Sequence, residues 1–149
     1  MMTGAGISVS AGVPDFRTPD TGIYDRIELL TGMKLPYKEA LFDVKYFIKH
    51  PQAYYLYRKE RMKEYDFTHE LTATPAHYFI RLLKEKCLLH KVFTQNTDEL
   101  HLKCGGLEEE EDVIHAHGHN GSAVCAVCRA KDSLDEFSKA ARIGEVRYC

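Results

Sequence analysis

The sequence predicts an α/β fold built on a parallel sheet, and three observations support this class. A glycine-rich loop stands at the N-terminus, over residues 4–17. A helix expected from Thr74 to about Lys86 leads into a short apolar strand at 92–94, and another strand begins at Val113. Polar side chains follow both strands. Because ligands bind at the carboxyl edge of open α/β sheets, these polar segments are candidate site residues.

Composition restricts the class of protein. The 149 residues suit one ordinary domain or part of a larger one, and 44% hydrophobic residues can form a real core. The net charge of −2 offers no excess of cations for phosphates, so we expect no direct nucleic-acid partner. We see no transmembrane run and no signal peptide, and therefore expect an intracellular protein with no membrane partner. Five cysteines in a reducing compartment indicate metal ligands or buried thiols rather than disulfides.

The N-terminal loop begins with two glycines around one small residue, Gly4-Ala5-Gly6. Such a loop turns sharply and can bring its N–H groups against a phosphate. The dinucleotide fingerprint is incomplete, because its third glycine would fall at Val9. Only residues 1–3 precede the loop, so no strand is expected before it. A glycine turn without a ligand is an equal alternative.

The segments between the loop and the first strand are expected to be mostly helical. Residues 18–32 predict a loop with one short helix, and the aromatic-rich stretch 37–67 predicts two helices separated at Pro51. Its tyrosines could line a ligand site, but core packing is the favoured interpretation. Thr74 is the expected N-cap of the next helix, with Pro75 at its first position.

The tetrad after the strand at 92–94 is polar and consists of Gln95, Asn96, Thr97 and Asp98. It is either a site at the carboxyl edge of the sheet or a plain turn. A second helix is expected from Glu99 to about Lys103, and the acidic run 108–112 is interpreted as a solvated connection.

Three histidines alternate in His115-Ala116-His117-Gly118-His119, directly after the start of the next strand. Residues two apart in a strand share one face. The pattern therefore predicts either a metal-binding ladder or one catalytic histidine with two bystanders, with ordinary polar histidines as the simpler alternative.

Cys125 and Cys128 form a C-x-x-C pair, and Cys149 follows at the spacing of the third ligand in C-x2-C…C-x2-C zinc sites. The fourth ligand would come three residues after Cys149, outside the sequence. A redox role is less favoured, because no thioredoxin-like strand and helix surround the pair. Cys87 and Cys104 lie in helical patterns and are interpreted as buried packing thiols.

Taken in order, the glycine loop, the tetrad, Ala116-His117-Gly118 and the cysteine pair resemble the sirtuin family of NAD-dependent protein deacylases. Segments 35–37, 46–47 and 77–83 are most similar to its cytoplasmic and nuclear eukaryotic class. The resemblance implies a partial Rossmann-like parallel sheet with an inserted helical segment and a partial zinc-ribbon module. The implied parts are an NAD-binding loop with the start of the Rossmann-like domain at 1–36, a helical insertion at 37–73, the rest of that domain at 74–118, and an incomplete zinc-binding module at 119–149.

The resemblance also implies a role for each candidate residue. His117 matches the catalytic base, whereas His115 and His119 match no functional position of the family. NAD would contact two sets of residues. The first comes from the N-terminal loop and comprises Gly4, Ala5, Gly6, Ile7, Ser8, Val9, Asp15, Phe16 and Arg17. The second is the tetrad Gln95, Asn96, Thr97 and Asp98. Three of the four structural zinc ligands would be Cys125, Cys128 and Cys149.

The implied function is NAD-dependent deacylation, in particular deacetylation, of lysine in proteins such as histones or tubulin, in the cytoplasm or nucleus. NAD would be consumed to nicotinamide and acyl-ADP-ribose, and zinc would be structural. Two residues depart from the family pattern, because Thr97 stands where an aliphatic residue is usual and His115 where an acidic one is common. With no strand before Gly4 and nothing after Cys149, we expect a piece of a longer enzyme.

Two other functions are weighed against deacylation. A catalytically inactive sirtuin-like remnant could bind a protein partner or NAD through the same surfaces. An ordinary NAD oxidoreductase is disfavoured, because Val9 breaks the dinucleotide fingerprint and no acidic ribose ligand stands at the expected distance.

Overall fold

The structure is a computed structural model that describes residues 1–19, 22–64 and 71–149. The chain divides into two compact units. Unit 1 comprises Met1–Asp15 and Phe67–Gly121, and unit 2 comprises Phe16–Asp66 and Ser122–Cys149. Within the described ranges, no helix is both long and apolar enough to cross a lipid bilayer.

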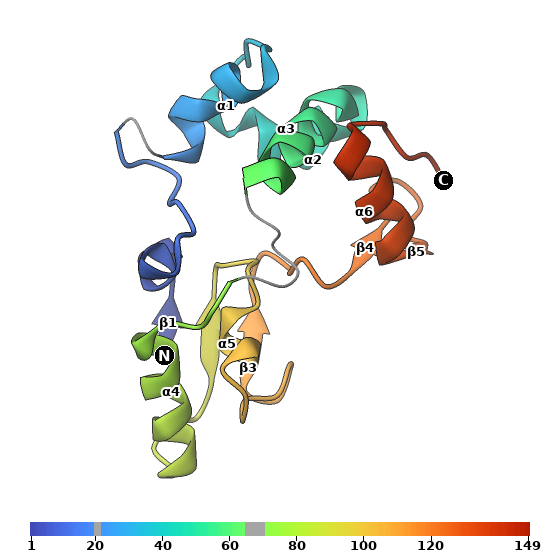
Figure 1. Cartoon of the computed structure of the whole chain (residues 1–149). Helices are drawn as coiled ribbons and strands as arrows, with labels where there is room; N and C mark the ends of the chain where they lie inside the picture. The colour runs from blue at the N-terminus through green and yellow to red at the C-terminus, as the bar shows by residue number, and fades with distance from the viewer. Residues whose placement is uncertain (20–21, 65–70) are drawn as a thin grey trace. The chain divides into compact units, whose positions relative to one another are not determined.

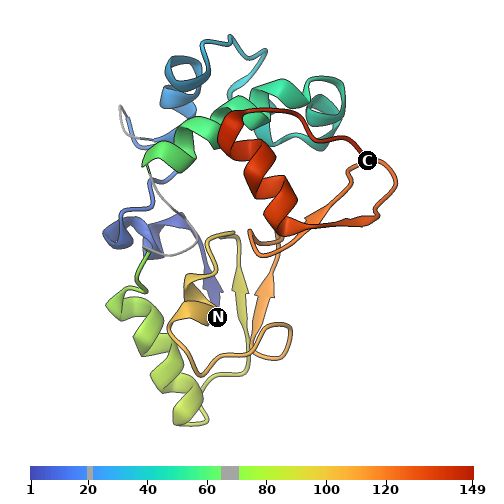
Figure 2. The ribbon, with the colours of Figure 1, turned by 45° about the vertical axis from the view of Figure 1, so that its right-hand side comes forward.

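Unit 1 is built on a parallel sheet of three strands in the order β1-β2-β3, as Figures 1 and 2 show. The strands are β1 (Met2–Thr3), β2 (Val92–Thr94) and β3 (Val113–His115). The expected α/β class is thus confirmed. The prediction that no strand precedes the loop is wrong, because Phe93 N donates to Met1 O at 2.9 Å and Gln95 N to Thr3 O at 3.1 Å.

One face of this sheet is covered by two helices, α4 (Pro75–Glu85) and α5 (Leu100–Lys103). Val92 and Val113 are fully buried, whereas Phe93, pointing to the opposite face, is half exposed. The residues that pack with these two valines are Ala73, Ile80, Cys104 and Leu107, with Ile7, Leu89 and Leu102 at the margin. This core contains the first residues of β2 and β3, and Ile7 of the loop that follows β1 packs against it.

Helix α4 begins as the sequence predicts, with Thr74 as its N-cap and Pro75 at its first position. The Thr74 N–H donates to His77 Nδ1 at 3.1 Å, and the Thr74 hydroxyl lies 3.1 Å from Ile7 O, to which it donates. The start of α4 is therefore bonded to the N-terminal loop.

Two expectations for unit 1 are corrected. The acidic run is not entirely solvated, because Asp112 is buried, pairs with Lys84 and accepts a hydrogen bond from Glu108 N at 3.0 Å. Cys104 is buried as expected, whereas Cys87 is exposed and lies beyond α4 with a φ of 55°. One carboxylate of an otherwise polar run can be buried when a lysine on an adjacent helix forms an ion pair with it, as Lys84 does with Asp112.

The N-terminal part of unit 2 is helical, with α1 (Ile23–Thr31), the 3-10 helix η3 (Lys38–Phe42), α2 (Val44–Lys49) and α3 (Pro51–Glu64). Pro51 begins α3, so the expected separation of two helices is confirmed. Tyr55 and Tyr57 are buried, in agreement with core packing. The core of this part consists of Ile23, Ile27, Leu41, Ala53 and Tyr57.

The C-terminal part of unit 2 is a short antiparallel pair, β4 (Ala123–Val124) and β5 (Lys131–Asp132), followed by α6 (Leu134–Ile143). Helix α6 packs on α3 (Figure 2). The rings of Tyr55 and Phe137 lie 5.7 Å apart. Helix α6 was not among the elements predicted from the sequence. Its signal was Ser133, whose hydroxyl accepts from Glu136 N at 3.4 Å as an N-cap.

Candidate functional site

The N-terminal loop leaves β1 as two short 3-10 turns, η1 (Ala5–Ile7) and η2 (Val9–Ala11). A side chain added at Gly4 or Gly6 would meet nothing within 4 Å, so the backbone at both glycines faces open space. Glycine leaves the main chain uncovered at such positions. The loop can therefore be approached by a ligand at its backbone.

Ser8 fastens this loop to the segment that follows β2. Its side chain is fully buried, and its hydroxyl donates to Asp98 Oδ2 at 2.6 Å. Asn96 Nδ2 lies 3.1 Å from both Ser8 Oγ and Gly4 O and donates to them. A bond to a carboxylate is among the stronger hydrogen bonds in proteins. The glycine loop and the tetrad are thus parts of one bonded cluster.

The tetrad continues the alternation of β2 beyond its end. Asn96 and Asp98 are buried, whereas Gln95 and Thr97 are exposed. Asp98 Oδ1 also accepts from Leu100 N at 3.0 Å, at the start of α5. The two inward side chains fix the backbone, and the two outward ones are free to meet a ligand.

The histidine segment does not continue as a strand, because β3 ends at His115 and Gly118 takes a φ of 74°. His117 is exposed in the resulting turn. The alternative of a three-histidine ladder is therefore wrong. Asn120 N donates to Thr97 O at 3.1 Å, so the chain just after the turn is tied to the tetrad.

The predicted cofactor and catalytic residues are distributed over both units. Unit 1 contains residues 4–9, Asp15, the tetrad and His117, and unit 2 contains Phe16 and Arg17. Within unit 2 the Phe16 ring meets the Phe42 ring edge-on at 5.8 Å, and the Arg17 guanidinium lies over the Tyr24 ring at 5.8 Å.

Two buried histidines, His77 and His101, support the site and were not among the predicted site residues. Their rings lie 4.7 Å apart, and His101 Nε2 is 2.9 Å from Thr3 Oγ1 in β1. The pKa of His101 is lowered to about 4, mainly by burial and secondly by the neighbouring His77. Its imidazole is therefore neutral at pH 7. Burial also lowers the pKa of His77. The available signal was His77 three residues after the Thr74 cap, where a polar side chain can bond back.

The cysteine cluster lies in unit 2, around the turn that joins β4 to β5. Among the described residues, Cys125, Cys128 and Cys149 are the group whose three ligand atoms all lie within 4.8 Å of one another. The Cys128 and Cys149 sulfurs are 3.5 Å apart. Backbone N–H groups of Cys128 and Val127 are the main cause that lowers the pKa of Cys125 to about 7. Thiolates gathered this closely suit a tetrahedral zinc ion.

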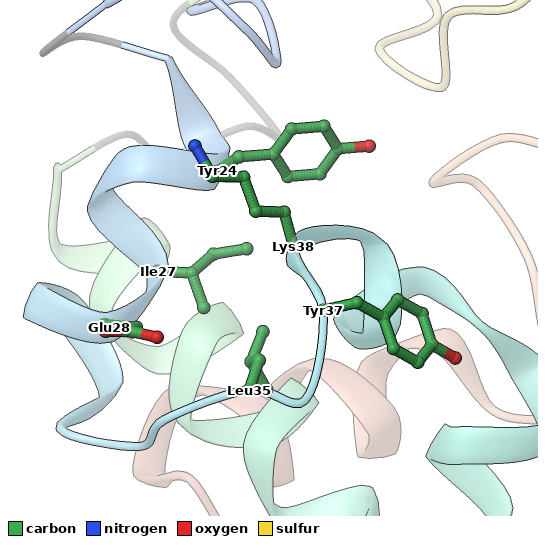
Figure 3. Close-up of a pocket in the computed structure, with 6 residues that line it drawn as sticks. All are labelled: Tyr24, Ile27, Glu28, Leu35, Tyr37 and Lys38. Carbon is green, nitrogen blue, oxygen red and sulfur yellow. The ribbon is translucent and has the colours of Figure 1, made fainter.

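Unit 2 also has a hollow of about 290 Å³ between α1 and the segment at residues 35–38 (Figure 3). Two phenols, two aliphatic side chains, one carboxylate and one amine line it: Tyr24, Ile27, Glu28, Leu35, Tyr37 and Lys38. None of the predicted site residues is among them. The Tyr37 hydroxyl donates to Oδ2 of Asp43, which is not a lining residue, at 2.9 Å.

Comparison with known proteins gives consistent matches over nearly the whole chain. The Sir2 family model matches residues 4–149. The chain is 42% identical to the NAD-dependent deacetylase sir2A of Dictyostelium discoideum, over 91% of the chain and 24% of that protein. It is 40% identical to the NAD-dependent protein deacetylase sirtuin-2 of Danio rerio, over 99% of the chain and 37% of that protein. It is 44% identical to the NAD-dependent protein deacetylase hst2 of Schizosaccharomyces pombe, over 86% of the chain and 36% of that protein. The chain thus spans well under half the length of these relatives.

Proposed function

This chain belongs to the Sir2 family, and from that premise we propose that it carries the NAD-binding loop and catalytic base of an NAD-dependent protein-lysine deacylase. The observation that carries the proposal is the buried bond from Ser8 to Asp98, which joins the glycine loop to the tetrad at the carboxyl edge of the sheet. The relatives that match the chain are named NAD-dependent deacetylases. A site at this edge is the usual place for a nucleotide in a parallel α/β sheet.

The residues in unit 1 fit NAD. The open backbone at Gly4 and Gly6 suits close approach of a pyrophosphate, and the exposed Gln95 and Thr97 can contact the ligand from the tetrad. Residues 5–9, with Gly4, would hold the pyrophosphate and adjacent ribose, and Asp15 would contact the nicotinamide end. When bound, NAD supplies the nicotinamide–ribose bond that is broken in the reaction.

The chain's own residues would position reactants and move one proton. The cluster of Ser8, Asn96 and Asp98 holds the loop and tetrad in a fixed relation, which places the reacting groups without a protein nucleophile. His117 is solvent-exposed in its turn, so an imidazole nitrogen can accept a proton from a hydroxyl of the bound reactants.

We further propose that Cys125, Cys128 and Cys149 are three ligands of a structural zinc ion. Their sulfur atoms are already gathered, and zinc would fix the β4–β5 turn to the C-terminal segment. The proposed substrates are acylated lysines in proteins, with histones and tubulin as candidates in the nucleus and cytoplasm.

The test is release of nicotinamide by the purified protein with NAD and an acetyl-lysine peptide. We expect release that depends on the peptide and falls by at least about 100-fold in His117→Ala, the scale of general-base catalysis. His90→Ala, an exposed histidine outside the site, is the matched control and should retain activity. Binding of NAD without peptide-dependent release would support the inactive remnant, and equal release by His117→Ala would refute the role of His117.

A further inference from the structure

A second cluster of ligand-type side chains lies in unit 1 and is not used by the proposed deacylase chemistry. It contains His115, His119, Glu99 and Glu109. His119 Nε2 is 2.9 Å from Glu109 Oε1, and His119 Nδ1 is 3.2 Å from Glu99 Oε1. The rings of His115 and His119 are 5.2 Å apart. Two imidazoles and two carboxylates therefore face one another on either side of the turn that carries His117.

His115 is the unusual member of this cluster. Its side chain is only 4% exposed, yet neither ring nitrogen has a hydrogen-bond partner among the described residues. Its Nδ1 lies 4.0 Å from Glu109 Oε1. A buried polar group without a partner is costly, and native structures rarely keep one without a reason. A ligand bound at Nδ1 would supply the missing partner.

The backbone holds the carboxylates of the cluster in place. Glu109 pairs in parallel with Val113 beside β3, and Glu99 has a left-handed φ of 59° just before α5. A side chain at Gly121 would come within 2.4 Å of Glu99 Oε1, so glycine is needed there for Glu99 to reach His119. These contacts bring the cluster together from three separate segments of unit 1.

We propose that His115, His119 and Glu109 bind a transition-metal dication such as Zn²⁺, Ni²⁺ or Co²⁺, with Glu99 orienting His119. Imidazole nitrogens and carboxylate oxygens are the ligand set that such ions take. The placement of Glu109 Oε1 between the two imidazoles makes it the shared neighbour of both nitrogens. Glu99 Oε1 lies 3.2 Å from the other nitrogen of His119, Nδ1, which in this structure accepts from Gly121 N at 3.2 Å. With the metal on Nε2, Nδ1 would carry a proton and donate it to Glu99, which would fix the ring orientation, as carboxylates do behind many metal-bound histidines.

The site must close to hold the ion. Among the described residues only the three cysteines bring three ligand atoms within 4.8 Å of one another, so the histidine nitrogens do not yet share one coordination sphere. His119 is the residue that moves, because it is partly exposed and follows Gly118 with its φ of 74°. Bound metal would then restrain the turn that carries His117.

The experiment is a cobalt titration of the purified protein after addition of one equivalent of zinc, which the thiolates of the cysteine cluster take up in preference to imidazole and carboxylate ligands. We expect one further equivalent of Co²⁺, with ligand-field absorption but no thiolate-to-cobalt charge-transfer band. Ni²⁺ calorimetry should show affinity at least about 10-fold weaker in His115→Gln, His119→Gln and Glu109→Gln, and roughly 10-fold weaker or more in Glu99→Gln. Glu108→Gln, an exposed neighbour, is the matched control and should leave affinity unchanged.

Three results would overturn the proposal. One is the absence of a further equivalent of Co²⁺. Another is unchanged Ni²⁺ affinity in His119→Gln, whose partly exposed side chain can be replaced without unfolding the core. The third is that Cys125→Ser binds no Co²⁺ at all while His119→Gln still binds the further equivalent of Co²⁺, because the ion would then belong to the cysteine cluster. Because none of these readouts depends on deacylation, they are independent of the proposed enzymatic function.

Discussion

Replacing Ser8 with alanine should destabilise unit 1 more than any nearby loop substitution. The change removes the 2.6 Å bond to Asp98 Oδ2 and the 3.1 Å bond accepted from Asn96 Nδ2, while the side chain position is fully buried. A hydrogen bond to a charged group contributes about 1.5–3 kcal/mol and a neutral one about 1 kcal/mol. The free energy of unfolding should therefore fall by roughly 2.5–4 kcal/mol, because both former partners remain buried and lose one bond each.

The assay is urea unfolding followed by circular dichroism, with amide hydrogen exchange to localise the effect. Ser10→Ala is the matched control, since Ser10 is exposed in the same loop. The Leu100 N–H, which donates to the other oxygen of Asp98, should exchange faster in Ser8→Ala. A loss below about 0.5 kcal/mol, the usual range of surface substitutions, would refute the importance of this bond. Unchanged exchange at Leu100 would do the same.

Three further predictions concern pH and metal. The pKa of His101 is about 4 in the folded chain against 6.5 ordinarily, so only the unfolded state takes up this proton as the pH falls from 6.5 to 4. The free energy of unfolding should therefore drop by roughly 3 kcal/mol over that window. His101→Leu should flatten this pH profile, which urea titrations measure. The bond from Lys84 lowers the pKa of Asp112, so Asp112→Asn should cost about 1 kcal/mol at pH 7, and this difference should vanish as pH falls through the lowered pKa. Chelation of zinc, or Cys149→Ser, should lower the melting temperature reported by unit 2, and an unchanged melting curve would contradict the proposed zinc site.

The sequence predicts those helices and strands that have a local signal of their own, such as a cap residue or an apolar run. Thr74 and Pro75 mark the start of α4 unambiguously, and the apolar residues before Gln95 mark β2. Strand β1 has only two residues and no pattern of its own, because its pairing is decided by the backbone groups of β2. So short a strand can be recognised only once the position of the adjacent strand, here β2, is known.

The site was predicted as a set of residues, but the contacts among them required the structure. Nothing in the spacing shows that Ser8 meets Asp98, since the two are 90 residues apart in the chain. The alternation of His115, His117 and His119 suggested that all three lie on one face of a strand. The chain instead turns at Gly118, so His117 does not share a strand face with the other two. His101 gave no signal, because a buried histidine in a short helix looks like a surface residue until its partner in β1 is known.

The strands of unit 1 are too short to fix the N-terminal loop by apolar packing alone, and polar contacts supply what is missing. The loop carbonyls of Gly4 and Ile7 accept bonds from Asn96 and Thr74, which belong to the tetrad and to the start of α4. Hydrogen bonds are directional, whereas burial of apolar area is not. Two such bonds from different elements set the orientation of the loop as well as its position, so its open backbone is presented in a defined direction before any ligand arrives.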